Sequence, residues 1–186
     1  MEQNKENPLQ GTIFDDYDTI IFDLDNTLWD CYLLDGSATY AFKTAPPYRL
    51  AMPSVVVDVN GSIIRLQQGA RMLIEKLDEA NKNLGIVSAG ELDNKPQEAQ
   101  PSILLLKKFD LYKYFNYDVI VSKLAIEDKS QYVKPSGKTL LIDDNKEYTD
   151  AVNALGKVDV LWRRAFGNWD ELLVQKSARL NLGFMK

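Results

Sequence analysis

The chain has 186 residues and a formal net charge of −5 at neutral pH, with 45% hydrophobic and 26% charged residues. This length and composition suit one α/β domain with a real core and leave little room for a second. The acidic balance argues against sequence-independent binding of nucleic acid, because such binding needs a basic face.

The chain contains no histidine and a single cysteine, Cys31. A Ser-His-Asp triad, a Cys-His pair, a histidine-ligated metal and an internal disulfide are therefore excluded. Any acid–base chemistry must come from carboxylates, lysine, tyrosine or the cysteine. No apolar run approaches the roughly 20 residues of a membrane span, and the polar N-terminus lacks a signal-peptide core. We therefore expect a cytoplasmic protein without a membrane partner.

The N-terminal part begins with a polar segment, residues 1–16, in which nothing is periodic. We interpret it as a tail or peripheral arm, followed by a single domain over residues 17–186. The run Thr19-Ile20-Ile21-Phe22 is short, apolar and β-branched, which predicts a buried strand of parallel type.

A hairpin is predicted next. Residues 30–51 are irregular and rich in aromatic side chains, which we interpret as packing against the edge of the domain. The β-branched runs 54–59 and 62–66 flank Asn60-Gly61, a dipeptide typical of a type I′ turn with two positive φ angles. The segment 30–67 is thus expected to form a loop and small hairpin flap, because it is too short for a large cap domain.

In the remainder of the chain, amphipathic helical patterns alternate with short apolar runs. This alternation predicts a mostly parallel sheet with helices on both faces, in which ligands gather at the carboxyl ends of the strands. Helices are predicted over about 67–83, from Pro101 toward Phe109, through Tyr148 to Leu155, and near the C-terminus around Leu172 and Leu173; strands are predicted over 84–88, 117–121, 139–142 and 158–162.

Acidic pairs follow two of the predicted strands. Asp23 and Asp25 come after the first strand, and Asp143 and Asp144 end a later one. Two carboxylates that lie so close together need a cation or a shared proton between them. Four converging carboxylates without histidine indicate a hard-cation site suited to Mg²⁺. The second pair could also cap the helix that follows it.

A third strand ends at Ser88-Ala89-Gly90, where a hydroxyl and backbone N–H groups of small residues could cradle phosphate oxygens. Lys123, Lys129 and Lys134 lie between this turn and the second acidic pair, and any of them could neutralise a phosphoryl group. A nucleophile, a metal, charge clamps and an acid–base group are the parts that phosphoryl transfer needs.

These motifs resemble those of the haloacid dehalogenase (HAD) superfamily of phosphotransferases. The stretch Asp23-Leu24-Asp25-Asn26-Thr27-Leu28 matches the DxDx[TV][LV] signature, and the order acid pair, serine, lysine, acid pair matches the family's four motifs. From Tyr17 onward the chain is similar to the small capless magnesium-dependent phosphatases. The resemblance implies a Rossmann-like HAD fold, with a mostly parallel sheet, a small β-hairpin flap and no large cap domain.

The resemblance also implies roles for the acidic residues. Asp23 is expected to be the nucleophile, and Asp25 to protonate the leaving alkoxide and then activate water. Mg²⁺ is expected on the Asp23 carboxylate, the Asp25 backbone carbonyl and one aspartate of the second pair. Asp144 is favoured for direct ligation and Asp143 for an outer-sphere role.

The phosphate-binding residues implied are Ser88, Ala89 and a lysine. Lys129 is preferred, since in the similar phosphatases this lysine starts a helix ahead of the acidic strand. The interval to Asp143 is shorter than usual, so Lys123 and Lys134 stay open. Ala89 stands where the similar phosphatases tend to carry an arginine, which leaves the substrate type open.

The predicted function is therefore that of a Mg²⁺-dependent phosphatase, which hydrolyses phosphate monoesters through an aspartyl-phosphate. Its substrate is expected to be a phosphorylated small molecule or a phosphoprotein, and the protein a monomer or weak dimer. One alternative is a HAD-like transferase acting on acyl-carrier-linked glyceryl groups. Another is a non-catalytic HAD-fold binding protein or a receiver-like domain, although the Asp-x-Asp pair after the first strand argues against a receiver.

Overall fold

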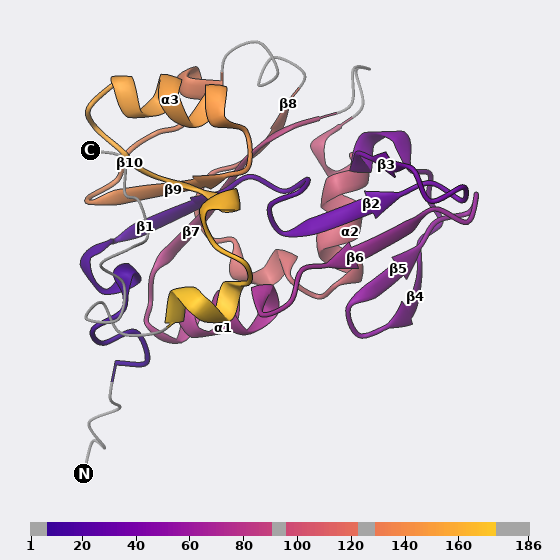
Figure 1. Ribbon diagram of the computed structural model, residues 1–186, viewed down its shortest axis with the longest axis horizontal. Coiled ribbons are helices and arrows are strands. Elements are labelled where there is room, and N and C mark those ends of the chain that lie inside the picture. The colour runs from indigo at the N-terminus through magenta and orange to yellow at the C-terminus, as the bar shows by residue number, and fades with distance from the viewer. Residues whose placement is uncertain (1–6, 91–95, 123–128, 174–186) are drawn as a thin grey trace.

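The protein is built on a central sheet whose strands all run parallel. The computed structural model describes residues 7–90, 96–122 and 129–173. Figure 1 shows the sheet, whose five strands follow the order β10-β9-β1-β7-β8. The strands are β1 (Thr19–Phe22), β7 (Asn83–Ala89), β8 (Val119–Ser122), β9 (Thr139–Asp143) and β10 (Asp159–Trp162). The predicted parallel α/β sheet is confirmed.

Helices cover both faces of this sheet. In Figure 1, α3 (Lys146–Ala154) lies over one face and α1 (Ala70–Glu79) over the other. A third helix, α2 (Pro101–Lys108), starts with the predicted proline. Every residue of β1 and β9 is buried, as expected for strands that are covered on both sides. β1 and β9 therefore hold the residues at their carboxyl ends in a fixed position.

Two helix starts differ from the sequence-based expectation. The helix predicted from residue 67 begins only at Ala70, because Gly69 adopts the left-handed conformation with φ 79°. α3 is capped by Asn145, whose side chain accepts hydrogen bonds from the backbone N–H groups of Glu147 and Tyr148. Asp143 and Asp144 therefore do not cap this helix, and their side chains are left for other contacts.

The flap is larger than the predicted hairpin. The expected pair, β5 (Val55–Val57) and β6 (Ile63–Leu66), belongs to an antiparallel sheet with the order β3-β2-β6-β5-β4. Its other strands are β2 (Trp29–Tyr32), β3 (Ala38–Thr39) and β4 (Arg49–Met52). The prediction of an irregular segment over 30–51 was wrong, because these short strands gain their hydrogen bonds from partners distant in the chain. No large cap domain lies over β1 in the described part of the chain, as predicted.

The turn of the hairpin also differs from the prediction. Gly61 has a φ of 84°, but Asn60 lacks the positive φ that a type I′ turn requires. The Asp58 backbone N–H donates to the Ser62 carbonyl at 3.0 Å, which leaves three residues between them. The Asp58 carboxylate accepts hydrogen bonds from the N–H groups of Asn60 and Ser62 at 2.9 and 2.7 Å. This aspartate, rather than Asn60, organises the turn.

Both ends of the described chain pack onto the domain. Within the predicted N-terminal arm, Leu9 and Phe14 are fully buried in the core. Near the other end, Trp169–Leu173 forms a 3-10 helix where an α-helix was predicted, and Trp169 is buried. Among the described residues, no helix combines the length and apolar character needed to cross a membrane.

Candidate active site

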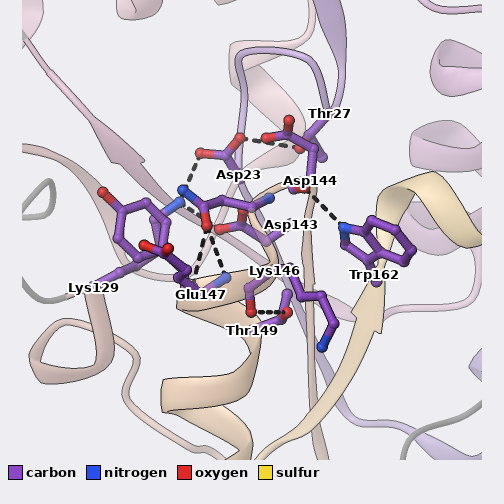
Figure 2. Close-up of polar contacts among 11 residues, drawn as sticks. Asp23, Thr27, Lys129, Asp143, Asp144, Lys146, Glu147, Thr149 and Trp162 are labelled. Carbon is purple, nitrogen blue, oxygen red and sulfur yellow. Dashed lines mark hydrogen bonds and ion pairs between the residues drawn. The ribbon is translucent and has the colours of Figure 1, made fainter.

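Two acidic side chains meet where β1 and β9 end. The strands are parallel neighbours with Phe22 opposite Ile142, so Asp23 and Asp143 leave the sheet side by side. The Asp23 backbone N–H continues the pairing by donating to the Ile142 carbonyl at 2.9 Å. Asp144 follows directly, and ligand oxygens of Asp23, Asp143 and Asp144 all lie within 4.8 Å of one another. The predicted convergence of the two acidic pairs is thus observed for these three carboxylates (Figure 2).

Lys129 lies between two of these carboxylates. Its ammonium donates to Asp23 Oδ1 at 2.8 Å and to Asp143 Oδ2 at 2.5 Å, and the side chain is 1% exposed (Figure 2). The same ammonium lies 5.0 Å from the centre of the Tyr148 ring. Burial acts to lower the pKa of Lys129, but the charges of Asp23 and Asp143 outweigh it and raise the pKa. The lysine therefore stays charged and offsets the charge of the carboxylates.

The other oxygens of these two aspartates are held as well. The Thr27 hydroxyl, four residues after the nucleophile candidate, donates to Asp23 Oδ2 at 3.0 Å. The Asn145 backbone N–H donates to Asp143 Oδ1 at 2.8 Å. Burial, and then the charge of Asp23, raise the pKa of the Asp143 carboxyl to about 7. The orientations of both carboxylates are thus fixed by hydrogen bonds on each side.

Asp25 occupies a different environment. Its Oδ1 accepts hydrogen bonds from Trp29 Nε1 and the Ala41 backbone N–H, both at 2.9 Å, and from the Cys31 thiol at 3.6 Å. Burial raises the pKa of Asp25 to about 7, and the charge of Asp23 adds to this against the opposing hydrogen bond from Ala41. Asp25 can therefore carry or release a proton near neutral pH.

Asp144 lies nearer the solvent. Arg164 Nη2 donates to its Oδ2 at 3.2 Å. Trp162 Nε1 donates to its backbone carbonyl at 2.8 Å (Figure 2). Burial, and then the charge of Asp23, raise the pKa of the Asp144 carboxyl. Both partners come from the end of β10, so three adjacent strands contribute to one cluster.

The carboxylates open into a cavity of about 550 Å³. Ser88 and Ala89, at the end of β7, line this cavity, so the three predicted clusters meet there. On the flap side the cavity is lined by Tyr40 and Phe42, whose rings stack with centroids 5.6 Å apart. The interpretation of the flap aromatics as packing residues was therefore wrong for this pair, and the flap forms part of the cavity wall.

The lysines have different places in the structure. Lys134 points away from the carboxylates, because its side chain is 64% exposed and pairs with Asp118 at 3.1 Å. Lys123 lies outside the described residues. Of the two candidates that the structure describes, Lys129 is the one that contacts Asp23.

A buried network beneath the Asp25 turn was missed from the sequence. Arg163 Nε donates to Gln67 Oε1 at 2.7 Å, and Arg163 Nη2 donates to the same oxygen. Gln67 Nε2 in turn donates to the Asn26 carbonyl at 3.1 Å and to Asp30 at 3.2 Å. No local motif could reveal this network, since Gln67 and Arg163 are 96 positions apart.

A family model described as Acid Phosphatase matches residues 17–164. The chain belongs to the acid phosphatase family. This family is HAD-like, which confirms the resemblance drawn from the motifs, and the protein is accordingly a phosphatase, a hydrolase acting on phosphate esters. Phosphatases of this type generally use a divalent metal, and the buried acidic cluster is a set of ligands suited to one.

Among solved structures, the acid phosphatase chain is similar to an uncharacterized protein from Listeria monocytogenes serotype 4b. The likeness has a TM-score of 0.48 and 16% sequence identity, and it covers 89% of this chain and 85% of that one. A comparison with curated proteins finds no significant match.

Proposed function

We propose that this phosphatase hydrolyses phosphate monoesters with Mg²⁺, by transferring the phosphoryl group to Asp23 and then to water. One observation carries the proposal. The Asp23 carboxylate lies in an open cavity with its two oxygens held by Lys129 and Thr27, beside two further carboxylates. This arrangement combines a fixed nucleophile with a cation site, which are the main requirements of phosphoryl transfer.

The residues present fit Mg²⁺. Asp23, Asp143 and Asp144 offer oxygen ligands within 4.8 Å of one another, and the chain has no histidine to favour a softer metal. Asp23 and Asp144 would hold the ion directly with the Asp25 backbone carbonyl, and Asp143 would act from the outer sphere, because its side chain is 1% exposed whereas that of Asp144 is 13% exposed toward the cavity. When bound, Mg²⁺ would supply positive charge beside the nucleophile and the phosphoryl oxygens.

In the first step, Asp23 attacks phosphorus and the ester P–O bond breaks. Thr27 keeps one carboxylate oxygen in place, and Lys129 offsets negative charge that gathers at the site. Asp25 gives its proton to the leaving oxygen, since burial raises its pKa to about 7 and a proton is available near neutral pH. The hydrogen bonds from Trp29 and Ala41 hold Oδ1 of Asp25, which leaves Oδ2 for this transfer.

In the second step, Asp25 takes a proton from water, and the water oxygen attacks phosphorus and releases Asp23. Ser88 and the backbone at Ala89 would bind the phosphoryl oxygens, as both residues line the cavity from β7. Inorganic phosphate leaves, and the proton taken from water has restored Asp25 to its initial protonated form. Each group thus returns to its initial state.

The substrate is a phosphorylated small molecule or a phosphorylated protein side chain. The cavity is about 550 Å³, and the flap lines it without a large cap domain above it in the described chain. A small cavity beneath a flap admits the phosphoryl group and part of the leaving group, while the rest of the substrate extends into solvent.

Release of inorganic phosphate from a panel of esters, with Mg²⁺ and with a chelator, tests the proposal. We expect Mg²⁺-dependent release by the parent protein, and loss of at least about 1,000-fold in Asp23→Asn. Asp110→Asn is a matched control, because Asp110 is exposed, pairs with Lys113 and has a φ of 57°, which asparagine tolerates. Turnover that survives Asp23→Asn would contradict the assigned nucleophile. Absence of turnover on every ester would favour the non-catalytic or acyl-carrier alternatives.

A further inference from the structure

The cavity has a cationic side chain at its rim that the chemistry above does not use. Arg164, directly after β10, lines the cavity, and its side chain is 64% exposed. Within the described chain, its guanidinium donates a hydrogen bond to Asp144 Oδ2, at 3.2 Å. A guanidinium has five donors in a planar fork, so most of its capacity faces the opening.

The other cationic side chains that line the cavity already pair with carboxylates of the protein. Lys129 is buried against Asp23 and Asp143. Lys146 donates to both carboxylate oxygens of Asp150 at 3.0 Å, and Figure 2 shows its side chain directed away from Asp23. Among the described residues, Arg164 is therefore the cation placed to meet a substrate group at the mouth of the cavity.

Its distance from the nucleophile defines what it can reach. Asp144 offers an oxygen within 4.8 Å of an oxygen of Asp23, and Arg164 Nη2 lies 3.2 Å from Asp144 Oδ2. A leaving group with a short carbon chain spans this gap when its phosphoryl group is at Asp23. The part of the wall formed by the stacked rings of Tyr40 and Phe42 offers mainly aromatic surface, so a charged end of the leaving group is favoured beside Arg164.

We infer that Arg164 forms a subsite for a second anionic group, a carboxylate or a second phosphate, on the leaving group of the substrate. Guanidinium pairs with such groups through two parallel hydrogen bonds, and this gives orientation as well as affinity. The inference rests on the proposed phosphatase function. Residues Trp162 and Asp144 hold the guanidinium in place from beneath, since Trp162 fixes the backbone of Asp144.

A pair of substrates of matched length tests the inference. 3-Phosphoglycerate and glycerol 3-phosphate differ in carrying a carboxylate or a hydroxymethyl group at the far end. We measure kcat/KM for both at saturating Mg²⁺ in the parent, Arg164→Gln, Arg164→Lys and Arg49→Gln. Arg49 is exposed on β4, at the far edge of the flap sheet and outside the cavity lining, so its substitution controls for the change in net charge.

We expect the parent to prefer 3-phosphoglycerate, and Arg164→Gln to reduce this preference by about tenfold, the effect of one charge-assisted pair. Arg164→Lys should keep part of the preference and Arg49→Gln all of it. An unchanged preference in Arg164→Gln overturns the inference. So does an equal fall for both substrates, because Arg164 would then act only by orienting Asp144.

A binding measurement separates failure of the inference from failure of the proposed function. If the parent hydrolyses neither these esters nor any other ester of the panel with Mg²⁺, the proposed function fails. Calorimetric titration of the Asp23→Asn protein with the two phosphates then decides the inference alone. The subsite is supported if the Asp23→Asn protein binds 3-phosphoglycerate more tightly than glycerol 3-phosphate and the double variant, Asp23→Asn with Arg164→Gln, does not. Equal binding of the two phosphates by the Asp23→Asn protein overturns the inference.

Discussion

Replacing Lys129 by methionine removes the positive charge between Asp23 and Asp143 while keeping a side chain of similar length. The ammonium lies 2.8 and 2.5 Å from these carboxylates, and its side chain is 1% exposed. Removing one partner of a buried ion pair costs about 3–5 kcal/mol, since the remaining charge is left without compensation. We expect Lys129→Met to lower the free energy of unfolding by this amount at pH 8 in the absence of metal.

The cost should depend on pH in a defined direction. Without Lys129, Asp143 loses a partner that lowers its pKa, so its pKa rises further above the unfolded value. A carboxyl with a raised pKa in the folded state is not destabilising while both states are protonated. Its penalty grows as pH rises from the unfolded-state pKa to the folded-state pKa. Lys129→Met should therefore be least harmful near pH 4 and most harmful at pH 8.

Urea denaturation of the parent and variant, with chelator and with Mg²⁺, measures both effects. Mg²⁺ would replace the lost charge, so it should stabilise Lys129→Met more than the parent. Once the Mg²⁺ concentration exceeds the variant's dissociation constant 100-fold, the variant should gain about 2.7 kcal/mol over its metal-free form. Lys134→Met is the matched control, since Lys134 is 64% exposed, and it should change stability by less than about 0.5 kcal/mol. A loss below about 1 kcal/mol for Lys129→Met at pH 8 without metal would refute the reasoning.

Three further predictions follow from buried groups. Burial raises the pKa of Asp25 from 3.8 to about 7, so ionised Asp25 destabilises the metal-free protein as pH rises through that window. Asp25→Asn should gain stability relative to the parent between pH 4 and 8, by at most about 4 kcal/mol in urea denaturation, and a pH-independent difference would contradict this. Gln67→Ala should lower kcat about tenfold with little change in KM, because Gln67 holds the Asn26 carbonyl beside the catalytic turn; steady-state kinetics in which only KM changes would contradict a positioning role. Gly69→Ala should lower the thermal midpoint through a loss of about 1–3 kcal/mol, since its φ is 79° and the added Cβ would lie 2.5 Å from an Asp170 carboxylate oxygen; an unchanged midpoint would contradict this.

The acidic part of the site was predictable because its signal is local. A buried β-branched strand followed directly by Asp23 and Asp25 specifies where both carboxylates emerge, and the same holds for Asp143 after β9. Parallel pairing of neighbouring strands then brings the two ends together.

The lysine was not predictable in this way. Lys129 meets Asp23 across 106 positions in the chain, and Lys123, Lys129 and Lys134 were all candidates for this contact. The choice between them depends on how the segment before β9 folds back over the strand ends, which no spacing rule specifies. Burial distinguishes the two candidate lysines that the structure describes: Lys129 is enclosed, and Lys134 lies at the surface.

The flap shows a second limit of sequence reasoning. Only the adjacent strands β5 and β6 gave a hairpin signal, whereas β2 pairs with β6 from more than 30 positions away (Cys31 opposite Ile64). Asn60-Gly61 was read as a two-residue turn, but the Asp58 carboxylate binds the N–H groups of the loop and stabilises a longer one. The Asp58 side chain overrides the Asn-Gly preference in the turn, and pairing with a distant strand decides the position of β2.

Chemical trapping of the phosphorylated enzyme tests the central claim, that Asp23 carries the phosphoryl group. Borohydride reduces an acyl phosphate to an alcohol and so converts phosphorylated aspartate to homoserine. We would mix Asp25→Asn with Mg²⁺ and p-nitrophenyl phosphate, whose leaving group needs no proton, and quench with borohydride. Since this variant lacks the base for hydrolysis, the intermediate should accumulate, and peptide mass spectrometry should find homoserine at position 23. Release of p-nitrophenol with Asp23 unmodified, or with homoserine at another aspartate, would contradict the account.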